Sequence, residues 1–169
     1  SGSGKSVMIK CLIGLEIPDS GSIEIMSQKL EHLSLKALDE IRADIGFLFQ
    51  GSALYDSMTV RENLEFPLRR HISKFGNVKD TLPLVEEALQ NVGLKNVIDL
   101  MPNELSGGMK RRVALARTLI LKPKIIIYDE PTTGLDPITS KEIILLMKSV
   151  QEKYKTSSII ITHDVDCAR

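Results

Sequence analysis

The sequence predicts an α/β fold built around a mainly parallel β-sheet. Three observations lead to this prediction. A glycine-rich segment with a lysine opens the chain and runs into an apolar stretch of helical length. Two short apolar runs, Ile125–Tyr128 and Ser158–Thr162, have the length of buried strands. Between such runs the apolar residues recur at helical spacing, and this alternation is typical of α/β proteins.

Length and composition indicate one soluble globular core. The chain has 169 residues, of which 43% are hydrophobic and 26% are charged. Lys plus Arg and Asp plus Glu each number 22, so the net charge is zero and nucleic acid is not the expected main partner. The longest unbroken apolar run, Ile143–Met147, is far too short to cross a bilayer. Cys11 and Cys167 form no metal or disulfide pattern by spacing, which favours a reducing compartment.

The first residues, SGSGKS, are the second half of the phosphate-binding loop G-x-x-x-x-G-K-[ST]. Glycines let backbone N–H groups curl around phosphate oxygens, and the helix that follows adds partial positive charge at its N-terminus. Lys5 is then expected to reach the β- and γ-phosphates of a nucleotide, and Ser6 to hold Mg²⁺. Gly14 is expected to end the helix. The competing interpretation is a Gly/Ser linker that happens to carry a lysine.

The chain starts inside this motif. We therefore expect it to be truncated at both ends. The strand that precedes such a loop is expected beside Ile125–Tyr128, and a core without that strand would expose a long apolar edge.

A second strand and a helical insert are predicted next. Ile45–Phe49 reads as a buried strand that ends at Gln50, which by itself is an ordinary loop residue. Residues 52–103 then form a helical insert in the α/β core. Thr59-Val60-Arg61-Glu62 fits a capping box, and Leu84–Val92 has the spacing of an amphipathic helix.

A further helix is predicted from Ser106 to about Leu121. Ser106 stands at the N-cap position, before two glycines. The predicted buried stripe of this helix consists of Met109, Val113, Ala116 and Ile120. Four basic residues are expected on its solvated surface, rather than in a nucleic-acid site: Lys110, Arg111, Arg112 and Arg117.

Two carboxylates follow the strand Ile125–Tyr128. Because ligands bind at the carboxyl ends of strands in open α/β sheets, Asp129 and Glu130 are candidates for chemistry. Adjacent strand residues point to opposite faces, so we expect different roles for the two. Asp129 suits Mg²⁺, and Glu130 suits a base that polarises an attacking water. Two acids that end a strand by chance are the alternative.

The chain closes with a helix and a strand. Asp136 as N-cap and Pro137 at the first helical position predict a helix to about Tyr154. Ser158–Thr162 is expected to be a strand buried on both faces. His163 follows it and should leave the sheet at the same edge as Asp129 and Glu130, which makes it a candidate γ-phosphate contact.

Taken in order, these motifs resemble the ATP-binding subunit of ABC transporters over nearly the whole chain. The motifs are SGSGKS, Gln50, LSGGM (Leu105–Met109), IIIYDEP (Ile125–Pro131), GLDP (Gly134–Pro137) and ITHD (Ile161–Asp164). The resemblance implies a P-loop NTPase (RecA-like) core with an inserted helical subdomain. Residues 1–51 and 104–169 would form the core, and residues 52–103 the helical subdomain.

The resemblance also implies ATP and Mg²⁺ as cofactors and a role for each matched residue. Glu130 would be the catalytic glutamate and His163 the switch histidine. Mg²⁺ would be held by Ser6, Gln50 and Asp129. ATP would be bound by Ser1, Gly2, Ser3, Gly4, Lys5, Ser6, Val7, Gln50, Ser106, Gly107, Gly108 and Asp136.

The implied assembly is a head-to-tail homodimer. Each ATP lies between the phosphate-binding loop of one copy (Walker A, Gly2–Ser6) and the signature of the other (LSGGM, Leu105–Met109). The dimer would work with a transmembrane permease, on the cytoplasmic side of the inner membrane. The segments LFQGSALYDSMTVRENLEFPLR and MPNELSGGMKRRVALAR are similar to the Mla/Mce-type ATPases. This similarity implies phospholipid as cargo and a lipid-binding substrate protein as a further partner.

The sequence departs from the usual family pattern at two further points, and two alternative functions are left open. The signature ends in Met109 where many members have Gln, and no adenine-stacking aromatic residue can be named in this chain. One alternative is a soluble ABC-type ATPase that acts on ribosomes or DNA. The other, a P-loop kinase, leaves LSGG and His163 unexplained.

Overall fold

The computed structural model describes residues 4–76, 79–163 and 167. Contacts within the chain divide it into two compact units, Ser1–Ile45 and Gly46–Arg169. Each unit is described by itself. In neither unit does the described part contain a helix that is long and apolar enough to cross a membrane.

The first unit joins two helices through a small hairpin. Helix α1 (Lys5–Leu12) is followed by β1 (Glu24–Ile25) and β2 (Gln28–Lys29), which pair antiparallel, by the 3-10 helix η1 (Leu30–His32) and by α2 (Leu35–Ala43). Gly14 stands beyond the end of α1 with φ 68°, as predicted for a helix stop. The Arg42 guanidinium, on α2, donates to the carbonyl oxygens of Ile13 (2.9 Å) and Gly14 (2.7 Å). It thus supplies hydrogen bonds to carbonyl groups just after the C-terminal end of α1.

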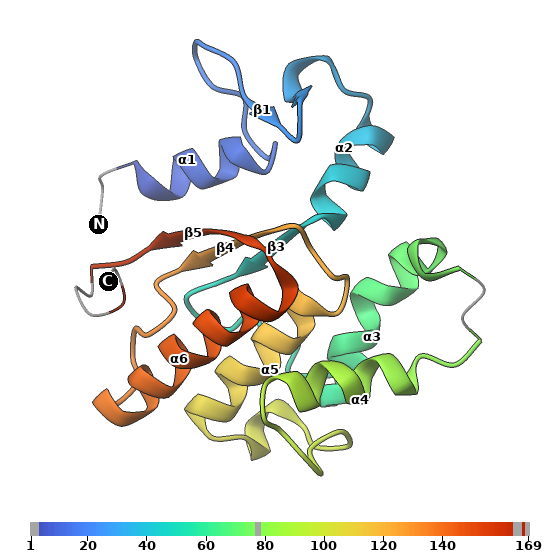
Figure 1. The fold of residues 1–169 in the computed structure, drawn as a ribbon, viewed down its shortest axis with the longest axis vertical. Coiled ribbons are helices and arrows are strands. Elements are labelled where there is room, and N and C mark those ends of the chain that lie inside the picture. The colour runs from blue at the N-terminus through green and yellow to red at the C-terminus, as the bar shows by residue number, and fades with distance from the viewer. Residues whose placement is uncertain (1–3, 77–78, 164–166, 168–169) are drawn as a thin grey trace. The chain divides into compact units, whose positions relative to one another are not determined.

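The second unit is organised around a three-stranded sheet in the order β3-β4-β5 (Figure 1). The strands are β3 (Ile45–Leu48), β4 (Ile125–Asp129) and β5 (Ser157–Ile161). Strands β4 and β5 are parallel, and Asp129 pairs with Ile161. The residues that follow these two strands therefore leave the sheet at the same edge, as the sequence predicts. The predicted α/β fold with a parallel sheet is confirmed.

Helices pack on this sheet and on one another. Figure 1 shows α5 (Gly107–Leu119) and α6 (Pro137–Tyr154) together on one face of the sheet, with α3 (Val60–His71) and α4 (Leu82–Asn91) beside α5. Two short 3-10 helices, η2 (Ile72–Phe75) and η3 (Pro102–Glu104), lie in the connections. The fully buried side chains of this core include residues of β3, α3, α4, α5, β4 and α6: Leu48, Leu64, Val85, Val113, Ile126 and Ile143.

The helix starts follow the predicted capping chemistry. Thr59 and Glu62 form the predicted capping box of α3: the Thr59 hydroxyl accepts from the Glu62 N–H, and the Glu62 carboxylate accepts from the Thr59 N–H at 2.8 Å. Ser106 caps α5, and Asp136 caps α6 with Pro137 as the first helical residue. Local sequence therefore decides where these three helices begin.

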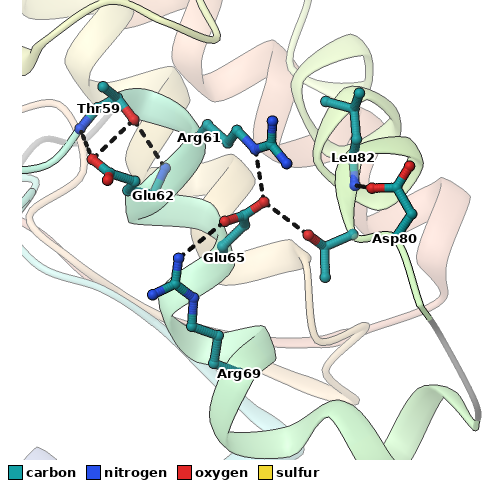
Figure 2. A network of polar contacts seen from close by, with 8 residues as sticks. Thr59, Arg61, Glu62, Glu65, Arg69, Asp80 and Leu82 are labelled. Carbon is teal, nitrogen blue, oxygen red and sulfur yellow. Dashed lines mark hydrogen bonds and ion pairs between the residues drawn. The ribbon is translucent and has the colours of Figure 1, made fainter.

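A buried carboxylate joins α3 to the start of α4 (Figure 2). Glu65, which is 7% exposed, accepts hydrogen bonds from Arg61 (2.8 Å), Thr81 (2.8 Å) and Arg69 (3.2 Å). Burial opposes the ionisation of Glu65, but these three hydrogen bonds together outweigh it and lower its pKa.

Strand β5 differs from the prediction. It was expected to be buried on both faces, yet Ile159 is 37% and Ile160 is 41% exposed. The cause is its place in the sheet: β5 is the outer strand among the described residues, with β4 on one side only. The expected position of a further strand beside β4 is also wrong, because β3 and β5 already occupy both edges of β4.

The basic residues of α5 are the second correction. Arg111 is only 4% exposed, and Lys110, Arg112 and Arg117 are half-buried. Leu115 and Leu119, four and eight residues after Arg111, are also buried, so the apolar face of α5 is wider than the single predicted stripe. Arg117 lies with its guanidinium carbon 5.6 Å from the Tyr55 ring centroid, and it donates to the Ser52 carbonyl at 3.2 Å.

Candidate active site

Glu130 and His163 meet at the carboxyl edge of the sheet. The Glu130 N–H donates to the carbonyl oxygen of Ile161 at 2.8 Å, which ties the residue after β4 to the end of β5. The Nδ1 atom of His163 lies 2.8 Å from Oε2 of Glu130, and the His163 backbone N–H donates to the same oxygen at 3.3 Å. The side chain of Glu130 is 12% exposed and that of His163 is 72% exposed. A shielded carboxylate is thus held by an accessible imidazole.

The backbone at Glu130 explains the direction of its carboxylate. Strand β4 ends at Asp129, and Glu130 has φ 48°, in the left-handed region. The expectation that Asp129 and Glu130 point apart by strand alternation therefore does not apply, because Glu130 belongs to a turn. In that turn the Thr133 N–H donates to the Glu130 carbonyl (3.3 Å), and the Thr133 hydroxyl lies 3.4 Å from Oε2 of Glu130.

The predicted signature residues line a cavity of about 430 Å³ at the start of α5. The Ser106 hydroxyl caps the helix by accepting from the Met109 N–H at 3.2 Å. Asp136 lines the same cavity, so the structure brings it together with Ser106. The cavity is lined by Ser106, Gly107, Gly108, Met109, Arg112, Gly134, Leu135, Asp136, Thr139 and Glu142.

Asp136 is held by the first turn of α6. Its Oδ1 accepts from the N–H groups of Ile138 and Thr139, each at 3.0 Å, and its Oδ2 accepts from the Thr139 hydroxyl at 2.6 Å. The hydroxyl bond, with the backbone bonds, lowers the pKa of Asp136. Asp136 is therefore an anion at neutral pH with a fixed orientation.

A second cavity, of about 450 Å³, lies beside His163. It is bounded by the turn after Glu130 and by the first half of α6. Its lining consists of Thr132, Thr133, Gly134, Leu135, Pro137, Ser140, Lys141, Ile144 and His163. Gly134 and Leu135 line both cavities, so the segment that carries Asp136 separates them.

Gln50 and Asp129 stand at the ends of neighbouring strands. Gln50 is exposed, two residues beyond β3, and Asp129 is the last residue of β4. The carbonyl of Phe49, just before Gln50, accepts a hydrogen bond from Arg111 at 2.8 Å. Two of the three predicted metal-binding residues are therefore at the carboxyl ends of strands, and the third, Ser6, belongs to the first unit.

The phosphate-loop residues belong to the first unit. Gly4 caps α1 with φ 75°, and a Cβ there would meet nothing within 4 Å. The N-terminus of α1, where backbone N–H groups can meet an anion, is thus preceded by a residue in a conformation that glycine adopts readily. Lys5 and Val7 lie in the first turn of α1. Ser1, Gly2 and Ser3 lie outside the described residues.

Three residues that make contacts in this site were missed by sequence reasoning. Thr133, in the turn, touches Glu130. Arg112 donates to the Val92 carbonyl and to Glu142, each at 2.9 Å, on the wall of the signature cavity. Arg111 joins Phe49 to Thr133 from inside the core. The buried leucines at helical spacing after Arg111 are the signal that would have indicated its burial.

The donor set decides what metal chemistry fits. No group of three or more His, Cys, Asp or Glu residues within the described ranges could hold a metal ion alone. Mg²⁺ is ordinarily held by one or two carboxylates together with substrate phosphates and water. A single carboxylate at the end of β4 fits that mode of binding, so Asp129 is a suitable ligand for Mg²⁺ that arrives with a nucleotide.

Solved structures similar to this chain are ABC cassettes. A dimeric bacterial ABC transporter cassette has a TM-score of 0.86 and 37% identity, and the match covers 100% of this chain and 74% of that one. An ATP-binding cassette in a dimeric post-hydrolysis state with ADP and Pi has a TM-score of 0.85 and 36% identity, with coverage of 99% and 73%.

Proteins with similar sequences are named for the transport of three different substrates. The probable ribonucleotide transport ATP-binding protein mkl of Mycobacterium leprae is 43% identical, over 100% of this chain and 48% of its own length. The phospholipid transport ATP-binding protein MlaF of Haemophilus influenzae is 40% identical, over 98% and 62%. The methionine import ATP-binding protein MetN of Clostridium tetani is 38% identical, over 98% and 51%. The chain thus spans about half to three fifths of the length of these relatives.

The family comparison agrees with the motifs and the fold. Residues 1–133 match the family described as ABC transporter. The chain belongs to the ABC transporter family of ATP-binding proteins.

Proposed function

We propose that this chain binds and hydrolyses ATP as part of an ABC transporter, and that Glu130 and His163 carry the chemistry. The observation that supports this most directly is the 2.8 Å contact between His163 Nδ1 and Glu130 Oε2 at the end of β4. A carboxylate in this position can accept a proton from an attacking water. Solved cassettes similar to this chain include one with ADP and Pi bound.

Each residue has a separate part in the proposed mechanism. Bound Mg²⁺ would neutralise charge on the phosphates, with Asp129, Ser6 and Gln50 as its protein ligands. Lys5 binds the β- and γ-phosphates. Glu130 orients the water, and His163 fixes the Glu130 carboxylate through Nδ1 while its exposed ring meets the γ-phosphate.

The test is a pair of variants in the full-length protein. Glu130→Gln should abolish ATP hydrolysis and leave ATP binding intact, because only the proton acceptor is lost. Lys5→Ala should instead weaken nucleotide binding, since a charge-assisted hydrogen bond contributes about 1.5–3 kcal/mol. Nucleotide binding by fluorescence and phosphate release separate the two effects. A Glu130→Gln protein that turns over ATP at the parent rate would show that Glu130 has been assigned wrongly.

We propose that two copies bind ATP head to tail, with Ser106, Gly107, Gly108 and Asp136 of one copy facing the nucleotide of the other. The N-terminus of α5 opens into the 430 Å³ cavity with backbone N–H groups available for an anion. A similar solved cassette is dimeric. Asp136 would then sit where the two copies meet.

A permease is the proposed membrane partner, and it would hold this chain at the inner face of the membrane. The proposed helical insert 52–103 presents two exposed aromatic rings whose centroids lie 4.9 Å apart. Tyr55, five residues after Gln50, is 42% exposed, and Phe66, on α3, is 47% exposed. Phe66→Ser should reduce co-purification of the permease. Leu145→Ser, which changes a still more exposed apolar residue of α6 (66% exposed), should not.

Phospholipid is the proposed cargo, and a lipid-binding substrate protein the proposed further partner. The proposal rests on the Mla/Mce-like segment MPNELSGGMKRRVALAR, and the Haemophilus relative carries a phospholipid name. Transfer of labelled phospholipid between vesicles and the reconstituted transporter should depend on ATP. Transfer of methionine or of a ribonucleotide instead would overturn the cargo while leaving ATP hydrolysis in place.

A further inference from the structure

Arg111 is a buried cation on the helix that starts at the signature residues. Its side chain lies in the second turn of α5, and the residue is 4% exposed. Nη1 donates to the Phe49 carbonyl at 2.8 Å, and Nη2 donates to the Thr133 carbonyl at 3.2 Å. Nε has no hydrogen-bond partner anywhere in the described chain. One guanidinium therefore spans two segments that are 84 residues apart in sequence (133 minus 49).

Packing alone does not explain an arginine here. Burial lowers the pKa of Arg111, and an arginine nevertheless keeps its charge. Its described partners are neutral carbonyl oxygens, which compensate a buried charge less well than a carboxylate does. An apolar side chain of similar length would fill the same space without the desolvation cost. The feature that an apolar residue could not reproduce is the fork of two donors.

The two carbonyls flank the residues assigned to catalysis. Phe49 immediately precedes Gln50. Thr133 closes the turn that begins at Glu130, and its hydroxyl lies 3.4 Å from Oε2 of Glu130. The fork therefore fixes the distance between the end of β3 and the turn after β4. Because α5 begins at Gly107, the same helix carries the residues that would serve the ATP of the partner copy.

We propose that Arg111 is a positioning residue for ATP hydrolysis, which holds Gln50 and the Glu130 turn in their working arrangement. The proposal rests on the proposed function. Arg111 acts through Phe49 and Thr133 and touches no nucleotide. It should therefore govern the rate of the chemical step and leave ATP affinity nearly unchanged.

The first experiment compares Arg111→Met, Arg111→Lys and Lys110→Met in the full-length protein. Lys110→Met is the matched control, because it removes the same charge from the neighbouring position, where the side chain is half-buried and makes no described polar contact. For Arg111→Met we expect kcat to fall roughly 10- to 100-fold, since small misplacements of catalytic groups have effects of this size. KM for ATP should change less than about threefold, as expected when an interaction made only in the transition state is lost. Arg111→Lys keeps the charge but lacks the planar fork of two nitrogens, so it should restore part of kcat. Lys110→Met should behave as the parent.

A purely structural role makes a different prediction. It would lower the thermal midpoint and leave kcat per folded molecule unchanged. That result, or a KM that rises by the same factor as kcat falls, would overturn the proposal. If Arg111→Met does not fold, Arg111→Lys decides: a parent value of kcat without the fork of two nitrogens would overturn the proposal.

A double-mutant cycle tests the route through Thr133. Thr133→Val removes the hydroxyl near Glu130 and keeps the carbonyl that Arg111 contacts. If Arg111 acts through this turn, the double variant should lose little more kcat than Arg111→Met alone. If the fold-losses in kcat of the two single variants multiply in the double variant, the proposed route through Thr133 is wrong. Failure of the proposed function is separable, because it would appear as an inactive parent or an active Glu130→Gln protein, whatever Arg111 does.

Discussion

At the scale of single residues, the second signature glycine is set by packing as well as by a nucleotide. A Cβ on Gly108 would lie 2.8 Å from the Thr139 methyl group, whereas one on Gly107 would meet only Leu135, at 3.8 Å. Thr139 is a β-branched residue in the first turn of α6, and its hydroxyl is bound to Asp136, so its methyl group cannot easily move. Gly108 therefore permits the close approach of α5 and α6. Packing does not require glycine at position 107.

We predict that Gly108→Ala lowers the free energy of unfolding by about 1–3 kcal/mol, the usual effect of overpacking, and that Gly107→Ala does not. Thr139→Ser removes the clashing methyl and keeps the hydroxyl that binds Asp136. The double variant Gly108→Ala/Thr139→Ser should therefore regain most of the lost stability. Chemical denaturation gives the free energy of unfolding of the parent, the two alanine variants and the double variant. Equal stability of the two alanine variants would contradict this account of Gly108.

At the scale of elements, the network around Glu65 joins α3 to the N-terminus of α4 (Figure 2). Three donors converge on one buried carboxylate, two from its own helix and one from Thr81. Hydrogen bonds to an ionised group are stronger than those to a neutral one, so replacing the carboxylate weakens all three contacts. The network is thus expected to hold the two helices of the insert together.

We predict that Glu65→Gln lowers the free energy of unfolding by about 1–3 kcal/mol at neutral pH. The pKa of Glu65 is lowered in the folded state, so its stabilising contribution is fully present above the unfolded pKa. It is lost as the pH falls through the folded pKa, below the ordinary value of 4.5. Urea titrations from pH 7 downward should show parent and variant converging in acid. Glu86→Gln, an exposed residue of α4, is the control, and a difference independent of pH would mean that Glu65 acts through packing instead.

The elements also show how far sequence reasoning reaches. Helix starts at Thr59, Ser106 and Asp136 were predicted because each depends on a side chain and the next three residues. Strands β4 and β5 were predicted from apolar runs, and their common edge brought Glu130 and His163 together. The exposure of Ile160 was not predicted, because it depends on which element lies opposite, and that information is not local. The burial of Arg111 was missed although Leu115 and Leu119, at helical spacing after it, indicate a buried face.

At the scale of the whole molecule, the structure separates two groups of candidate residues. Glu130 and His163 lie on one side of the segment Gly134–Asp136, and the signature cavity lies on the other. In the proposed dimer the two groups serve different nucleotides. Each active site then needs intact residues from both copies.

We predict that two inactive variants restore activity when mixed. Gly107→Asp adds a negative charge where the partner's phosphates would lie, at a position where a Cβ meets only Leu135 at 3.8 Å. Glu130→Gln removes the base of the chain's own site. A mixed dimer has one site with both defects and one with none. Random pairing should recover about a quarter of the parent rate, since half of the dimers are mixed and each has one intact site. Phosphate release from the mixture measures this, and no recovery at any ratio would argue against head-to-tail sites.

The left-handed backbone of Glu130 has an evolutionary consequence. A residue other than glycine costs of order 1 kcal/mol or more in this conformation, and asparagine tolerates it better than glutamate does. Under selection for thermostability alone, position 130 should drift toward asparagine or glycine. Only selection for turnover would keep glutamate there. The left-handed conformation thus turns the Glu130 carboxylate toward His163. The same conformation keeps the sequence away from its stability optimum at this residue, on which the proposed activity depends.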